Sequence, residues 1–268
     1  MTDHRDTTAD PDSLLFTDKK GNRGQLQDII DDGLDGGYEA RVPSLIHLQR
    51  HGDPYHQLLA SVMLSSWGEP TGLQALTGWA REPQEAPWAH YPVTFDRISG
   101  ADSAFELLAD AVRTSFHSKD AESIRALQID ALKALLGVAD SQYVGRTLTV
   151  AISRNPDVLA AVKPELRAAI DRGIASLRAK KQLPFDLATQ IASLLTALAQ
   201  LDDRAAAGSA RALIEVVPNN HRMLRELAAS LANGTGPDSL SVLRDLRQLG
   251  NGTLDEEINR ALARRASA

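Results

Sequence analysis

The sequence contains no cysteine, and its 268 residues include only 5 Phe, 3 Trp and 4 Tyr. The absence of thiols excludes disulfides, thiolate catalysis and zinc or iron–sulfur sites built on cysteine. No apolar run approaches the ~20 residues that a membrane-spanning helix needs, and the first residues are too polar for a secretion signal. We therefore expect a cytoplasmic protein that has no membrane partner.

The sequence also has no stretch in which apolar and polar residues alternate for long enough to form a sheet. Its apolar residues, 43% of the chain, are mostly Ala and Leu, which are the strongest helix formers. Residues 1–24 have few apolar side chains and are predicted to be a mobile acidic tail. Residues 25–268 are predicted to form a single all-α domain.

Four segments have the outline of a helix pair, in which an amphipathic helix, a short turn and a second amphipathic helix follow one another. They begin at Asp53, Ala121, Phe185 and Asn220. One such pair cannot bury its apolar faces alone, so several pairs are expected to stack into a continuous core.

The first of these segments resembles the HEAT/armadillo-like class, in particular the short bacterial HEAT units related to phycobilin-lyase repeats. The residues that carry the resemblance are the start Asp53-Pro54, the turn residue Gly68 and the packing positions Ala60, Leu64, Leu73 and Leu76. The later segments depart from the pattern, because they lack the Asp-Pro start. The resemblance implies a HEAT-like α-solenoid, an α-α superhelix of antiparallel helix pairs whose extended surface binds other proteins.

Charge and aromatic residues are concentrated in different parts of the chain. Residues 1–120 have a net charge of −9 and ten of the twelve aromatic residues, whereas residues 121–268 have a net charge of +3. An irregular, proline-containing loop at residues 81–101 carries three of the aromatic residues. This loop either presents aromatic anchors to a partner or folds back onto the layer of Trp67 and Trp79.

These features predict a non-enzymatic protein-binding module, such as a scaffold, an adaptor or an immunity-type inhibitor, that needs no cofactor. An acidic surface with aromatic anchors is suited to a basic protein partner. The residues expected to contact that partner are Asp31, Asp32, Asp35, Arg81, Glu82, Glu85, Trp88, His90, Tyr91 and Phe95.

The first alternative is a metal-dependent enzyme. The segment Asp31–Asp35, with the sequence DDGLD, matches the aspartate-rich motif of all-α prenyl-diphosphate enzymes, which hold Mg²⁺ between two facing carboxylate clusters. Glycine at position 33 weakens the helix that would present both ends of the motif, and no second cluster is visible. A separate pair, His47 and His51, has the i, i+4 spacing that can bind a transition metal, and the sequence leaves this possibility open.

The second alternative is nucleic-acid binding through a basic run between Arg154 and Lys181. Its members are Arg154, Lys163, Arg167, Arg172, Arg178, Lys180 and Lys181. The acidic balance of the whole chain, −6, disfavours this function, and nucleic acid is not the expected partner.

Overall fold

The computed structural model describes residues 10–90 and 102–248 and, near the C-terminus, residues 255, 256, 258–260, 262 and 263. Within these residues the protein is all-helical, as predicted, and an isolated bridge pairs Thr17 with Arg23. None of the described helices is long and apolar enough to span a membrane.

The α-helices are α1 (Pro11–Phe16), α2 (Leu26–Leu34), α3 (Val42–His51), α4 (Pro54–Ser66), α5 (Pro70–Arg81), α6 (Ala104–Ser115), α7 (Arg125–Val138), α8 (Gly145–Ser153), α9 (Pro156–Ala161), α10 (Lys163–Arg178), α11 (Leu187–Leu201), α12 (Asp203–Val216), α13 (His221–Leu231) and α14 (Pro237–Gln248). Two short 3-10 helices are η1 (Glu39–Arg41) and η2 (Pro83–Glu85). Helices are present in all four segments that the sequence predicts to be helix pairs, as α4 and α5, α7 and α8, α11 and α12, and α13 and α14.

The chain divides into two compact units. The first unit consists of the chain up to residue 94 together with residues 110–131. The second consists of residues 95–109 together with 132–268. Helices α6 and α7 contribute residues to both units.

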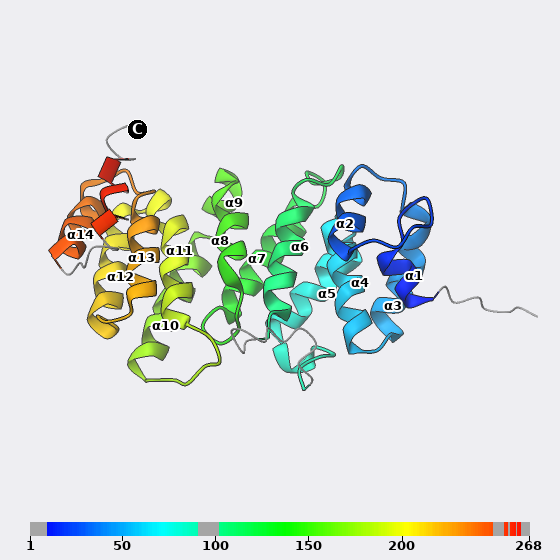
Figure 1. The fold of residues 1–268 in the computed structure, drawn as a ribbon, viewed down its shortest axis with the longest axis horizontal. Helices are drawn as coiled ribbons and strands as arrows, with labels where there is room; N and C mark the ends of the chain where they lie inside the picture. The colour runs from blue at the N-terminus through cyan, green and yellow to red at the C-terminus, as the bar shows by residue number, and fades with distance from the viewer. Residues whose placement is uncertain (1–9, 91–101, 249–254, 257, 261, 264–268) are drawn as a thin grey trace, which may run out of the picture. The chain divides into compact units, whose positions relative to one another are not determined.

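In the first unit, α4 packs between α3 and α5, and the three helices lie side by side (Figure 1). The Asp53 side chain caps α4 by accepting a hydrogen bond from the His56 amide, and Pro54 occupies the first turn. Gly68 follows the end of α4 with a φ of +83°, a left-handed conformation that glycine adopts without a steric penalty. These three residues have the local roles that the sequence predicts.

Residues 10–24, which the sequence assigns to a mobile tail, are folded. Helix α1 buries Leu15 completely. The Arg41 guanidinium donates hydrogen bonds to the carbonyl oxygens of Leu14, Thr17 and Asp18, and it stacks on the Tyr38 ring at 4.5 Å. The low apolar content of this segment is compensated by a single arginine that binds its backbone.

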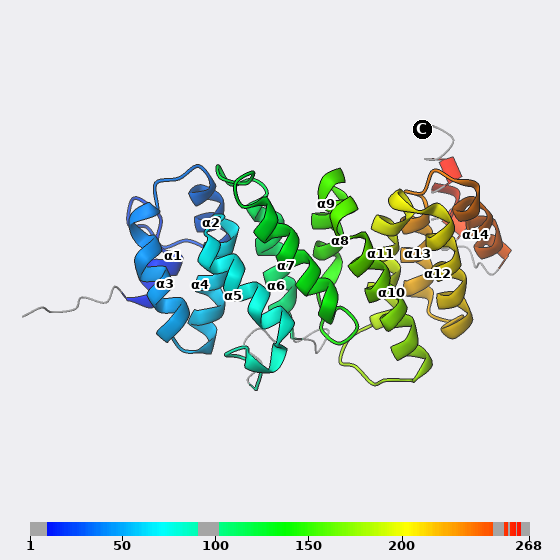
Figure 2. The same cartoon turned by 180° about the vertical axis from the view of Figure 1, so that it is seen from behind.

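In the second unit the helices form two layers. Helix α11 packs against α8 and α13 in one layer, and α12 packs against α10 and α14 in the other. Figure 2 shows α11, α12 and α13 side by side. Side-chain caps at Asp186, Asp202 and Asn220 begin α11, α12 and α13. The first layer presents a groove.

Candidate functional site

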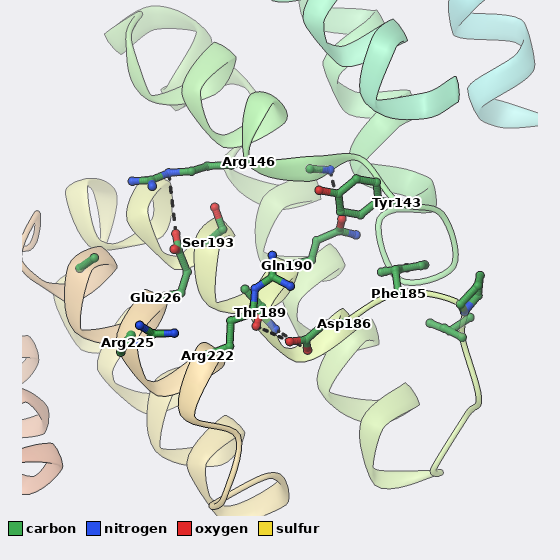
Figure 3. A pocket seen from close by; sticks show the side chains of 14 residues that line it. Tyr143, Arg146, Phe185, Asp186, Thr189, Gln190, Ser193, Arg222, Arg225 and Glu226 are labelled. Carbon is green, nitrogen blue, oxygen red and sulfur yellow. Dashed lines mark hydrogen bonds and ion pairs between the residues drawn. The ribbon is translucent and has the colours of Figure 1, made fainter. Parts of the chain in front are cut away.

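A groove of about 760 Å³ opens on the layer formed by α8, α11 and α13 (Figure 3). Cavities of this size accommodate ligands of several hundred daltons. The groove is lined by Tyr143, Gly145, Arg146, Leu183, Pro184, Phe185, Asp186, Thr189, Gln190, Ser193, Arg222, Arg225, Glu226 and Ala229.

Helical periodicity puts the groove-lining residues of α13 on one face of that helix. Arg222, Arg225, Glu226 and Ala229 are spaced i, i+3, i+4 and i+7, so they share one face of the helix. The opposite face of α13 carries buried residues such as Leu224 and Leu227, which fix its orientation in the unit. The polar stripe therefore faces the groove because the apolar stripe faces the core.

The floor of the groove is held by Gln190, whose side chain is almost fully buried. Its amide nitrogen donates to the carbonyl oxygens of Ala139 and Gln142, at 2.7 and 3.0 Å. Its amide oxygen accepts from the backbone N–H groups of Val144 and Gly145, at 3.0 and 3.2 Å. All four hydrogen bonds tie α11 to the segment that leads into α8, so this side of the groove is preformed.

One end of the groove is aromatic. The rings of Tyr143 and Phe185 lie with their centroids 5.8 Å apart, and both side chains are partly exposed (Figure 3). They are the only two aromatic residues after residue 120. An apolar surface of this kind can cover a side chain of a bound partner.

The other end is basic, with Arg146 and Glu226 on facing walls and Arg225 beside them (Figure 3). Arg146 Nε lies 3.8 Å from Glu226 Oε1, which is an ion pair without a hydrogen bond. The Glu226 side chain is 18% exposed, and its Oε1 atom is buried without a hydrogen-bond partner. Arg222 and Arg225 form no hydrogen bond or ion pair with another described residue.

The second carboxylate of the groove, Asp186, is already engaged. It accepts hydrogen bonds from the Thr189 amide and hydroxyl, at 3.1 and 2.6 Å, and from the Asn220 amide group at 3.2 Å. Asp186 therefore joins the N-terminal ends of α11 and α13. Three guanidinium groups remain against one carboxylate, Glu226, so the groove favours a ligand with negatively charged oxygen atoms.

This geometry defines an all-helical protein with a preformed groove that is aromatic at one end and rich in arginine at the other. Comparisons with protein-family models, with curated protein sequences and with solved structures find no match for the chain. Arguments about function therefore depend on the contacts of its own residues.

The structure separates the predicted binding residues into two groups at opposite ends of α5. Asp31 and Asp32 lie on α2, and Asp35 caps its C-terminal end. This group neighbours Trp67, just before α5 begins, because the Trp67 indole donates to the Ile30 carbonyl oxygen at 3.0 Å. Arg81 ends α5, which has 12 residues and is therefore about 18 Å long. The two groups are therefore separated by about the length of α5.

Part of the acidic group has a structural role. Asp32 accepts a hydrogen bond from the Tyr38 hydroxyl at 2.9 Å and pairs with Lys19 at 3.4 Å. Burial, together with the Asp32 hydrogen bond and charge, raises the pKa of Tyr38 to about 12. Asp31 accepts from the Gln27 side chain. Among the described residues, no group of three or more acidic, His or Cys side chains is arranged to hold a metal ion.

The aromatic loop also differs from the predicted surface. Trp88 is only 2% exposed, and its ring packs edge-on against Trp79 with centroids 4.8 Å apart. Trp88 is therefore a core residue, as in the fold-back arrangement that the sequence left open. Arg81 forms an ion pair with Asp130. The side chains of the remaining described members, Glu82, Glu85 and His90, are exposed, whereas Tyr91 and Phe95 lie outside the described residues.

The histidine pair and the basic run show no strong binding feature. The rings of His47 and His51 lie 4.7 Å apart, without a third ligand among the described residues. Lys163 pairs with Asp202 at 3.4 Å, and Arg172 pairs with Asp140 at 3.1 Å. Arg167 and Arg178 line a second groove, of about 650 Å³, together with Asp171 and Asp202, so the charge there is mixed.

The arginine-lined groove was not predicted, although two signals for it exist in the sequence. Tyr143 and Phe185 are isolated aromatic residues in a region otherwise without them, and each stands in a connection before a helix. Arg222 and Arg225 are spaced for one helix face. What the sequence does not reveal is that α8 and α13 flank α11, which brings the two signals together.

Proposed function

We propose that this chain is a non-enzymatic protein-binding module with a HEAT-like arrangement of helix pairs, and that the groove on α8, α11 and α13 is its working surface. The packing of α11 to α14 supports the HEAT-like arrangement, because α11 and α13, the first helices of two successive pairs, lie in one layer, and α12 and α14, the second helices, lie in the other.

The observation that carries the proposal is the pair Arg222 and Arg225, which are exposed and have no hydrogen-bond or ion-pair partner among the described residues, beside the half-exposed rings of Tyr143 and Phe185. Arginine and aromatic side chains are enriched among the residues that dominate binding energy at protein interfaces. The preformed floor below them reduces the entropy that is lost on binding.

The groove changes the expected partner from a basic to an acidic protein. In the first unit, Asp32 and Glu39 are paired with Lys19 and Lys119, so part of its negative charge is neutralised internally. In the groove the excess charge is positive and unpaired. Complementary charge then favours an acidic segment, and it disfavours the uniformly charged backbone of nucleic acid because Glu226 lies among the arginines.

Site-specific photo-crosslinking in the cells that express the chain tests this proposal. A benzophenone amino acid replaces Ala229 in the groove, Gln84 beside the buried Trp88, or Ser209 on the other layer of the second unit. We expect a protein adduct from position 229 and none from positions 84 and 209. An adduct only from position 84 would mean that the loop, and not the groove, is the working surface. The absence of any adduct would contradict a binding module.

A further inference from the structure

The groove is apolar at one end and basic at the other, and this difference limits the kind of segment that it can bind. Phe185 and Tyr143 form its apolar end, Arg146 and Arg225 its basic end, and Arg222 lies between them (Figure 3). A ligand that satisfies the whole groove therefore needs an apolar group at one end and negative charge along the rest.

We infer, on the basis of the proposed function, that the groove binds a short acidic peptide in an extended conformation. An aromatic side chain of the peptide packs against Phe185 and Tyr143, and carboxylates a few residues away pair with Arg222 and Arg225. Side chains on one face of an extended chain are ~7 Å apart, and the two arginines are one helical turn apart, so flexible guanidinium groups reach alternate carboxylates.

The volume of the groove supports a peptide more than a small anion. A cavity of about 760 Å³ is far larger than a single phosphate or carboxylate group requires. Part of its wall is apolar, because Tyr143, Phe185 and the neighbouring Leu183 and Pro184 line it. A free anion would leave this surface uncovered, whereas a peptide covers both ends at once.

Glu226 acts as a specificity-determining residue in this arrangement. Its carboxylate lies 3.8 Å from Arg146, too far for a hydrogen bond, and its buried Oε1 has no hydrogen-bond partner. It reduces the positive charge that a ligand encounters and repels carboxylates at the basic end. Replacing it by an uncharged residue of the same shape should strengthen the binding of an acidic peptide.

The test uses the full chain and a fluorescein-labelled peptide that contains one phenylalanine, one glycine and then three glutamates, with fluorescence anisotropy as the readout. The variant R222Q/R225Q removes the two free guanidinium groups. The matched control R167Q/R178Q removes the same charge from α10, on the other layer of the same unit. A glutamine-for-glutamate peptide and an alanine-for-phenylalanine peptide test the two ends of the groove.

We expect R222Q/R225Q to weaken peptide binding about tenfold, R167Q/R178Q to leave it unchanged and E226Q to tighten it about two- to fivefold. Both altered peptides should bind more weakly than the parent. Equal weakening by the two double variants would overturn the inference, because it would indicate unspecific attraction. Tighter, Arg222-dependent binding of a short single-stranded oligonucleotide would overturn it in favour of a nucleic-acid site.

The failure of this inference can be distinguished from the failure of the proposed function. If position 229 crosslinks a protein but the acidic peptide does not bind, the acidic-peptide inference is wrong and the binding module stands. If the peptide binds but no protein is crosslinked in cells, the binding-module function is wrong.

Discussion

The two units use the same residue types for different purposes. In the first unit, Trp67, Trp88 and Tyr38 are buried, and Arg41 is bound to three backbone carbonyl groups. In the groove of the second unit, the aromatic side chains are half-exposed, and Arg222 and Arg225 pair with none of the residues that the structure describes. An aromatic-rich region is therefore a poor indicator of a binding surface when its rings already have partners within the fold.

The largest expected effect is on the stability of the first unit. Trp88→Ala removes a fully packed ring next to Trp79, and large-to-small changes of this type lower the free energy of unfolding by about 3–5 kcal/mol. Thermal and urea unfolding measure the loss. Trp88→Phe is the control: it keeps a ring in the core and should cost less, because the indole nitrogen has no hydrogen-bond partner to lose. An unchanged melting temperature for Trp88→Ala would mean that this side chain is a surface anchor after all.

A second prediction concerns the glycine inside the aspartate-rich motif. A Cβ atom at Gly33 would overlap the Trp67 ring, so Gly33→Ala must displace the indole that donates to Ile30. We expect a loss of about 1–3 kcal/mol in unfolding free energy. Gly78→Ala on α5, where a Cβ meets open space, should instead stabilise the protein by about 0.5–1 kcal/mol. If both variants stabilise the protein, the close approach of Trp67 to α2 is wrong.

The sequence predicts the local features of the fold but not its long-range contacts. The cap at Asp53, the turn at Gly68 and the helix pairs follow from local rules, because side-chain caps and left-handed glycines act within a few residues. The contact of Gly33 with Trp67 joins residues 34 positions apart, and Arg41 binds backbone carbonyl groups more than 20 positions before it. Such partners are set by tertiary packing, and no local pattern encodes them.

The candidate site also depends on tertiary contacts that the sequence does not predict. Tyr143, Phe185, Arg222 and Arg225 are visible in the sequence as individual residues, but they become a groove only through the packing of α11 between α8 and α13. The predicted site, in contrast, depends on charge and aromatic content, which do not distinguish a buried Trp88 from an exposed one.

A smaller effect is expected from pH at the junction of α1 and α4. The His56 ring lies 2.7 Å from Asp53 and 3.5 Å from Asp12, and Arg23 also pairs with Asp12. Burial opposes the charged form of His56, but the hydrogen bonds and charges of both aspartates outweigh it and raise its pKa above the ordinary 6.5. Protonated His56 thus stabilises the fold fully below the pKa of the unfolded chain, and this contribution is lost as pH rises through the higher folded pKa.

Urea unfolding at about pH 6 and about pH 8 measures this contribution, which we expect to be below ~1 kcal/mol because the site is partly solvated. The wild-type chain should be less stable at the higher pH, and His56→Gln should reduce that difference. An equal difference in His56→Gln would assign the pH dependence to other groups.

The central claim is that the buried rings of Tyr38, Trp67 and Trp88 in the first unit serve folding, whereas Tyr143 and Phe185 in the groove serve binding. Phe185→Ala tests it most directly when thermal unfolding and acidic-peptide anisotropy are measured on the same sample. We predict a change in unfolding free energy within about 1 kcal/mol, together with a loss of peptide affinity of about tenfold. A stability loss as large as that of Trp88→Ala, with peptide affinity unchanged, would contradict the claim.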